Sequence, residues 1–118
     1  MSKILLKTIL GKSEIRVERG LFLKMDNLLL QKYPHSRFVV ILTTSLNKIY
    51  GKQIKKQLPE SLILPVQSGE DVKTMDTLLK LAGQLIDAGI TRQDVLIGVG
   101  GGMITDLAGF LASIYMRG

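Results

Sequence analysis

The chain has 118 residues, of which 46% are hydrophobic, and it carries a net charge of +6 and no cysteine. This length suffices for one domain with its own core and is too short for two. The absence of cysteine excludes a disulfide framework and makes the cytoplasm the expected compartment. The first ten residues include Lys3 and Lys7 and lack a continuous apolar run, so no signal peptide is predicted.

The positive charge is distributed as on an ordinary helix surface. Four lysines recur at helical spacing, namely Lys48, Lys52, Lys55 and Lys56. No aromatic residues lie between them apart from Tyr50, and aromatics are only 5% of the chain, so we expect no nucleic-acid partner. Residues 95–116 resemble a membrane span, but Asp106 near its centre would cost about 2.5–3.5 kcal/mol in a bilayer. We interpret this run as buried core and expect no membrane partner.

In chain order, the first predicted elements are two β-rich segments, residues 4–10 and 14–18. They are expected to form a hairpin that turns across residues 11–13. A leucine-rich helix follows over about residues 21–32, and Tyr33-Pro34 ends it.

Apolar strands and helices then alternate. Strands are predicted at residues 38–42, 62–66 and 95–99, the last buried on both faces. Hydroxyls at 43–45 are suited to capping a helix that runs to about Gln57. The clearest amphipathic helix has apolar positions that share one stripe: Val72, Met75, Leu78, Leu79, Ala82, Leu85 and Ile86. Gly89 is its expected C-cap, and an almost wholly apolar helix begins at Met103.

This alternation indicates an α/β fold with a right-handed parallel sheet and helices on both faces. Ligands of such sheets bind beyond the carboxyl ends of the strands. Three loops fit that description, at residues 43–45, 67–71 and 100–105, so the functional candidates should gather at one edge.

The strongest candidate is the turn Gly100-Gly101-Gly102 between the last strand and the last helix. Glycines let the backbone approach a ligand, and a helix N-terminus favours an anion such as pyrophosphate. The turn is not the dinucleotide fingerprint, because Met103 occupies the third glycine position, and no Walker lysine follows. A tight structural turn is nearly as good an interpretation as a phosphate cradle.

Asp106 and Arg117 are the charged residues of the last helix. A carboxylate in an apolar helix must be paired, hydrogen-bonded or solvated in a cleft, although first-turn dipole stabilisation also explains it. Eleven positions separate the two residues, which places them on one helix face about 16 Å apart. Without further information, Arg117 is better explained as a last-turn cation, with Gly118 as the cap.

Other polar residues are less informative. Glu70 and Lys73 are explained as first-turn charges, and His35 as a surface turn residue. One histidine and no cysteine make a transition-metal site within this chain improbable, and no nucleophile–histidine pair can be assembled. The residues by themselves indicate an α/β domain with an anion-binding edge that suits a nucleotide.

Two segments resemble the 3-dehydroquinate synthase family of sugar-phosphate cyclases. The first is GGGMITDLAGF at 100–110, followed by ASIYMRG at 112–118; the second is GEDVKT at 69–74. The related polyol and iron-dependent alcohol dehydrogenases share a glycine triplet, but the Tyr-x-Arg-Gly ending favours the synthase. The resemblance covers essentially the whole chain and is strongest over residues 64–118.

The resemblance implies a Rossmann-like N-terminal domain, residues 1–118, that binds NAD, and a helical C-terminal domain with a divalent metal, zinc or cobalt. Family members convert 3-deoxy-arabino-heptulosonate 7-phosphate to 3-dehydroquinate and phosphate in the shikimate pathway, and a homodimer is expected. The implied catalytic-pocket residues are Asp106 and Arg117. The implied cofactor-binding residues are Thr44, Ser68, Gly69, Glu70, Lys73, Gly100, Gly101, Gly102, Met103, Thr105 and Asp106.

Three departures accompany the resemblance. Thr105 replaces a common glycine, residues 43–45 lack the acidic residue that many members place near the adenosine ribose, and the family continues for about two more such lengths. We therefore expect a fragment that folds without catalysing. A non-catalytic nucleotide-binding module and half of a polyol dehydrogenase are the alternatives.

Overall fold

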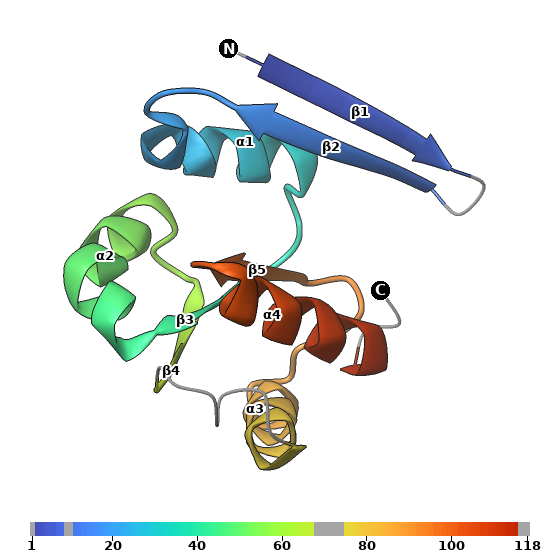
Figure 1. The fold of residues 1–118 in the computed structure, drawn as a ribbon. Helices are drawn as coiled ribbons and strands as arrows, with labels where there is room; N and C mark the ends of the chain where they lie inside the picture. Colours follow the sequence, from blue (N-terminus) through green and yellow to red (C-terminus); the bar gives the residue numbers. More distant parts are fainter. Residues whose placement is uncertain (1, 9–10, 68–74, 116–118) are drawn as a thin grey trace.

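The structure is a computed structural model that describes residues 2–8, 11–67 and 75–115. Its elements in chain order are β1 (Ser2–Thr8), β2 (Gly11–Val17), the 3-10 helix η1 (Leu21–Lys24), α1 (Met25–Lys32), β3 (Phe38–Thr43), α2 (Thr44–Gln57), β4 (Leu62–Val66), α3 (Met75–Asp87), β5 (Val95–Val99) and α4 (Gly102–Tyr115). Figure 1 shows them around a central sheet.

The central sheet is parallel, with the strand order β4-β3-β5. Thr43 pairs with Val66 and Leu42 with Val99, so the three carboxyl ends meet at one edge. Sequence reasoning predicted this parallel α/β fold, and the structure confirms it.

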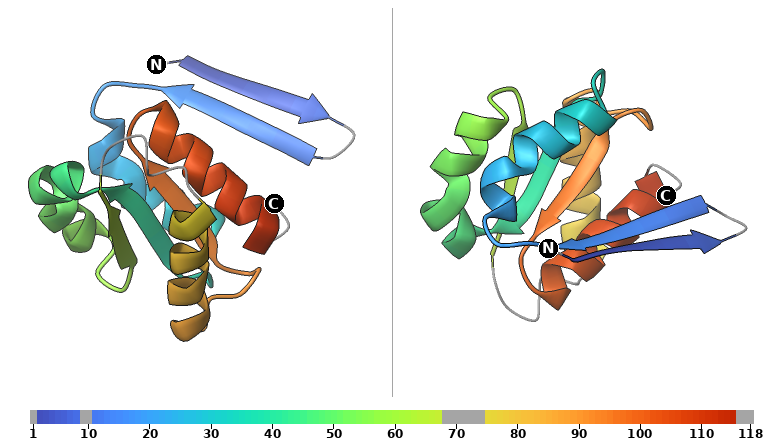
Figure 2. Two further views of the ribbon diagram at one scale, coloured as in Figure 1. Left: turned by 60° about the horizontal axis from the view of Figure 1, so that its bottom comes forward. Right: turned by 90° about the horizontal axis from the view of Figure 1, so that it is seen from above.

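Helices cover both faces of this sheet, as the predicted α/β fold requires (Figure 2). On one face, α2 and the η1–α1 segment pack against Val40 and Leu42. On the other face, α3 and α4 pack against Val39 and Ile41. The central strand β3 is therefore buried on both sides, and its apolar run Phe38–Leu42 forms the middle of the core.

The N-terminal hairpin forms a separate antiparallel sheet, in which Ile4 lies opposite Ile15. The prediction of a turn at residues 11–13 was wrong, because Lys12 pairs with Lys7 and Gly11 with Thr8 inside the ladder. Strand pairing thus continues to both sides of residues 9–10, which lie outside the described ranges.

Two helix ends follow the predicted chemistry. The side chain of Thr43 accepts a hydrogen bond from the Leu46 N–H at 3.2 Å and caps α2, which ends at Gln57 as expected. Gly89 has φ +70° and ends α3. The Ile90 N–H bonds to the Leu85 carbonyl and the Gly89 N–H to the Ile86 carbonyl, which is the Schellman arrangement.

Two predictions about burial need correction. β5 is only partly buried along its length, because it is an edge strand with one neighbour. In α3, Leu78, Leu81 and Leu85 face the core, whereas half of the predicted stripe is exposed: Met75 by 61%, Leu79 by 64% and Ile86 by 66%. The predicted stripe position Val72 lies outside the described residues. Periodicity identified α3 as a helix. It did not show how much of the apolar face of α3 is covered by the sheet and α4.

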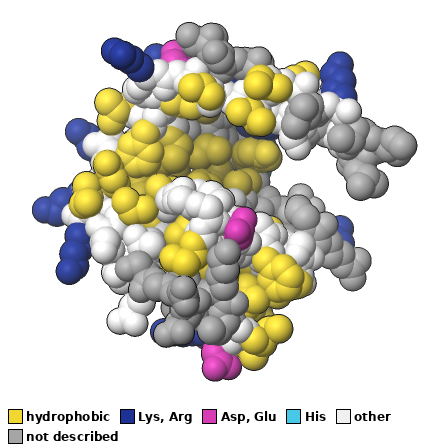
Figure 3. Space-filling model, in the orientation of Figure 1, with side chains coloured by type: hydrophobic (Ala, Val, Ile, Leu, Met, Phe, Trp, Pro, Cys, Tyr) yellow, Lys and Arg dark blue, Asp and Glu magenta, His cyan; other side chains and the backbone are white. Residues whose placement is uncertain are grey.

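One face of the molecule carries a band of apolar side chains. Figure 3 shows this hydrophobic band across the molecule, with Lys and Arg side chains around the margins of the view. The four lysines of α2 are all exposed, as the helix-surface interpretation predicts. None of the helices in the described ranges combines the length and apolarity that a membrane crossing requires.

Candidate functional site

The site lies at the carboxyl ends of two neighbouring strands whose following helices pack on opposite faces of the sheet. After β3 the chain enters α2 on one face, and after the adjacent β5 it enters α4 on the other. In open α/β sheets, this divergence leaves a crevice at the carboxyl edge, and ligands bind there. Since Leu42 pairs with Val99, the residues at the corresponding point of this sheet are Thr43 and Thr44 on one side and Gly100 on the other.

The three glycines of the turn have different surroundings. Gly100 has φ +147°, and a Cβ there would lie 3.3 Å from the Ile104 Cβ and 3.3 Å from the Leu46 Cδ1. This position is therefore packed between the first turns of α4 and α2. Gly101 and Gly102 are exposed, and no neighbouring atom of the described residues lies within 4 Å of their Cβ positions. Their backbone is accessible to a ligand.

The N-terminus of α4 adds the electrostatics that an anion needs. The N–H groups of Ile104 and Thr105 both bond to the Gly101 carbonyl at 3.1 Å, so the helical bonding starts at this glycine. The N–H groups in a first helical turn have no intrahelical acceptor, and the helix dipole adds positive potential there. No acidic residue lies in the first turn of α4. A phosphate group is thus chemically compatible with this end.

The Thr105 hydroxyl helps to hold the turn itself. It lies 3.3 Å from the Gly101 carbonyl and 3.1 Å from the Gly102 carbonyl, to which it donates. Its proton is used within the turn, and its oxygen remains available as an acceptor. Thr105 therefore ties the entry of α4 to its own backbone.

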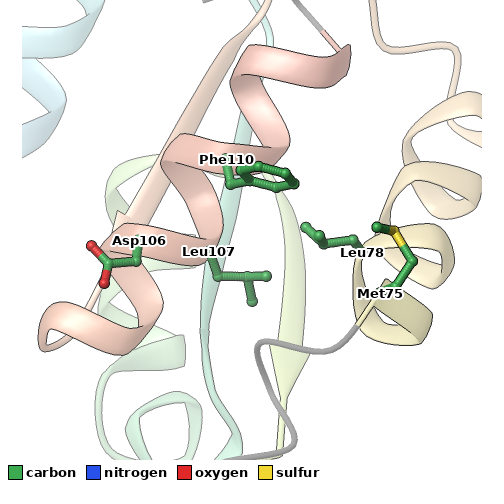
Figure 4. A pocket seen from close by; sticks show the side chains of 5 residues that line it. All are labelled: Met75, Leu78, Asp106, Leu107 and Phe110. Carbon is green, nitrogen blue, oxygen red and sulfur yellow. The ribbon is translucent and has the colours of Figure 1, made fainter.

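Asp106 is the fifth residue of α4, so it lies beyond the first turn, where a dipole effect is strongest. It is exposed at the border of a cavity of about 340 Å³ between α3 and α4. Figure 4 shows Leu107 and Phe110 pointing from α4 toward Leu78 and Met75 of α3, while the Asp106 carboxylate points away from them. The interhelical cavity is therefore lined mainly by apolar side chains, with Asp106 at its border and its carboxylate directed outward.

The structure thus brings together at one edge the described part of the predicted site: Thr44, Gly100, Gly101, Gly102, Met103, Thr105 and Asp106. Ser68, Gly69, Glu70, Lys73 and Arg117 lie outside the described residues. Sequence reasoning did not find Leu46, whose side chain closes the turn at Gly100 from α2. Only its place three residues after the end of β3 could have indicated this contact.

Charged groups also gather at the opposite, amino edge of the sheet, around Asp94. Its carboxylate accepts hydrogen bonds at 2.9 Å from the backbone N–H groups of Arg37 and Thr91. Burial raises the pKa of this carboxyl, but the backbone hydrogen bonds and the Arg37 guanidinium lower it further than burial raises it. These bonds join the starts of β3 and β5, so the cluster is structural. Within the described ranges, no group of three or more His, Cys, Asp or Glu residues could hold a metal ion.

Comparisons with known proteins show what the chain is similar to. Residues 63–118 match the sequence model described as "3-dehydroquinate synthase N-terminal". The chain is 35% identical over 109 residues to a 3-dehydroquinate synthase of Enterococcus faecalis, covering 89% of the chain and 30% of that relative. It is 46% identical over 66 residues to the enzyme of Saccharolobus solfataricus, covering 56% of the chain and 19% of that relative. The chain therefore spans about a third or less of the length of these relatives.

Solved structures agree in fold. A crystal structure of 2-deoxy-scyllo-inosose synthase complexed with carbaglucose-6-phosphate, NAD+ and Co2+ superimposes with a TM-score of 0.80 at 20% identity, covering 99% of this chain and 32% of that one. Another structure of 2-deoxy-scyllo-inosose synthase gives a TM-score of 0.83 at 18% identity, covering 99% and 34%. The sequence matches and the parallel α/β architecture agree: the chain is similar to the N-terminal portion of 3-dehydroquinate synthases, most specifically over residues 63–118.

Proposed function

We propose that this chain is the NAD-binding portion of a two-domain phosphate lyase of the 3-dehydroquinate synthase type. The observation that carries the proposal is the accessible backbone of Gly101 and Gly102 at the N-terminus of α4, at the carboxyl edge of the sheet where β3 and β5 end. A pyrophosphate fits there, because among the described residues no side chain lies against these two glycines, and no carboxylate occupies the first helical turn. The presence of NAD+ in a structural neighbour supports the same assignment.

In this proposal, different residues of the chain bind different parts of NAD. Gly101, Gly102 and Met103 would direct backbone N–H groups at the pyrophosphate, and Thr44 would border it from α2. Asp106 would reach the nicotinamide side. Further contacts would come from the segment after β4, through Ser68, Gly69, Glu70 and Lys73.

The reaction we propose for the whole protein is the conversion of 3-deoxy-arabino-heptulosonate 7-phosphate to 3-dehydroquinate and phosphate, in the shikimate pathway of the cytoplasm. NAD, when bound, supplies the transient oxidation of a secondary alcohol that makes phosphate elimination possible. Arg117 would bind an anionic group of the substrate. A divalent metal, zinc or cobalt, would be held by a second domain, and the enzyme would act as a homodimer. The 118-residue chain by itself would bind NAD without converting the sugar phosphate. Phosphate release by this chain alone would therefore contradict the proposal that catalysis needs the second domain.

Calorimetric titration of the chain with NAD tests the proposal, with ATP and a short RNA as controls. We expect saturable NAD binding that Asp106→Ala and Glu70→Ala each weaken about tenfold, since each removes a charged hydrogen-bond partner. Asp87→Ala, which removes an exposed carboxylate at the far end of α3, should leave the affinity unchanged. A chain that is folded by circular dichroism and binds no NAD would refute the proposal.

A further inference from the structure

The N-terminal hairpin stands apart from the central sheet. Among the described strands, β1 and β2 pair only with each other, so neither outer edge of this two-stranded sheet has a neighbouring strand. Figures 1 and 2 show the hairpin extending beyond the other elements. A two-stranded hairpin alone is at best marginally stable in water, and an open edge is a template for another strand. The hairpin is therefore a candidate for contact with a further chain.

Apolar side chains of the hairpin gather on one exposed face. Ile4 lies directly opposite Ile15, and Val17 is two positions further along β2, so the three share this face. Their exposed fractions are 52%, 47% and 64%. The other face carries Glu14 and Arg16, which form an ion pair of 2.9 Å and line a cavity together with residues of η1 and α1. A sheet with one solvated face normally turns its polar side to water, so the aliphatic face is the one that a partner would cover.

The order of charges along β2 matches a second copy of the same strand. In an antiparallel pair of two β2 strands centred on Ile15, each Glu14 lies opposite the Arg16 of the other copy. Opposite charges in directly opposed positions stabilise a strand pair, whereas like charges destabilise it. A centre one residue earlier or later would place Glu14 opposite Glu14, or Arg16 opposite Arg16. Charge therefore selects a single register.

The same register extends the apolar face across both copies. Ile15 meets Ile15 of the other copy, and each already lies opposite its own Ile4, so a row of four isoleucines would cross the combined sheet. The edge of β1 is less suited to such a pair. Centred on its middle residue, Leu5, it would place Lys3 opposite Lys7 of the other copy.

We propose that β2 is the contact through which two copies of this chain associate, centred on Ile15, into a four-stranded antiparallel sheet. The contact is isologous, as a two-fold dimer requires, because each Glu14–Arg16 pair across the centre occurs twice. The inference rests on the proposed function only for its homodimer, to which it gives a surface. It does not depend on NAD binding.

Sedimentation velocity of the 118-residue chain at low salt tests the charge pairing. Glu14→Lys and Arg16→Glu should each weaken self-association at least about tenfold, since each opposes like charges across the strand pair. An equimolar mixture of the two variants should associate as the chain without substitutions does, because the new lysine then faces the new glutamate. Lys48→Glu, a charge reversal on the exposed surface of α2, is the matched control and should leave association unchanged.

A disulfide tests the register without changing any charge. The chain has no cysteine, so Ile15→Cys and Val17→Cys each introduce a single thiol. In the proposed pair, the two Cα atoms at position 15 lie about 5 Å apart, within reach of a disulfide, and those at position 17 about 14 Å apart, out of reach. We expect mild oxidation to link Ile15→Cys at least about tenfold faster than Val17→Cys, although Val17 is the more exposed residue.

Three results would each overturn the inference: a chain without substitutions that sediments as a monomer, a mixture of the charge variants that does not associate, and equal cross-linking of the two cysteine variants. A chain that dimerises as described and binds no NAD would instead refute the proposed function and leave the β2 contact in place.

Discussion

Asp94 shows how one residue joins several elements at the edge opposite the site. Besides the two backbone N–H groups, it accepts from the Arg37 guanidinium at 3.1 Å. The same guanidinium donates to the Ala88 carbonyl at 2.9 Å and to the Gly89 carbonyl. Only 7% of the Asp94 side chain is exposed. The end of α3 and the starts of β3 and β5 therefore share one charged contact.

This contact predicts a pH dependence. The pKa of Asp94 is lower in the folded chain than in the unfolded one, so its carboxylate stabilises the fold above the unfolded-state pKa, near about 4. That contribution is lost as the pH falls through the folded-state pKa. At pH 7, Asp94→Asn should lower the free energy of unfolding by about 1–3 kcal/mol. Urea unfolding should show this difference shrinking below about pH 4, with Asp87→Asn as an exposed control. A difference that stays constant with pH would contradict the account.

At the scale of elements, Gln57 joins α2 to the N-terminal segment. Its side chain is buried at the end of α2, where Oε1 accepts the Asp26 N–H at 3.1 Å and Nε2 donates to the Phe22 carbonyl at 2.8 Å. These two backbone groups belong to the start of α1 and to η1. The amide thus holds the junction of the 3-10 helix and α1 against the end of α2.

Removal of this amide should loosen the N-terminal segment. Gln57→Ala leaves two backbone groups without their partner and should lower the free energy of unfolding by about 1–3 kcal/mol. Gln53→Ala, one turn earlier on the same helix, should change it by less than about 0.5 kcal/mol. Chemical denaturation measures both. Equal effects of the two substitutions would show that the amide does not join these elements.

For the whole molecule, α3 and α4 present apolar side chains to solvent. Phe110 is 50% and Ile114 54% exposed on α4, beside the exposed Met75 and Leu79 of α3, and the cavity at Phe110 lies between the helices. Apolar area of this kind binds hydrophobic probes. We predict that Leu79→Lys combined with Phe110→Lys lowers the fluorescence of bound anilinonaphthalene sulfonate without lowering the melting temperature. Ile49→Lys, 67% exposed on α2, is the control, and an equal decrease with it would contradict this assignment.

The sequence predicted most of this architecture, because periodicity and capping residues are local signals. Thr43 caps the start of α2 and Gly89 ends α3 as expected, and β4 has the predicted bounds. The edge position of β5 could not be predicted, since strand order depends on contacts distant in sequence. The predicted hairpin turn at residues 11–13 is misplaced, because Gly11 begins β2 and pairs with Thr8.

The candidate site was predictable in its location and less so in its detail. The glycine turn at a helix N-terminus identified the edge, and the parallel sheet placed Thr44 beside it. The difference between packed Gly100 and open Gly101 depends on Leu46 and Ile104, which only the fold brings to the turn. The hydrogen bond from the Tyr115 hydroxyl to the Ile90 carbonyl likewise spans elements that local patterns do not connect.

The most direct measurement is an NMR titration of the 118-residue chain with NAD, followed through its backbone amide signals. The account predicts saturable shifts concentrated at Gly101, Gly102 and Met103 and at Thr44, with little change at the amino edge around Thr91. Saturable binding whose shifts fall in the apolar cavity between α3 and α4, or at the amino edge, would contradict the assignment of the glycine turn as the cofactor site.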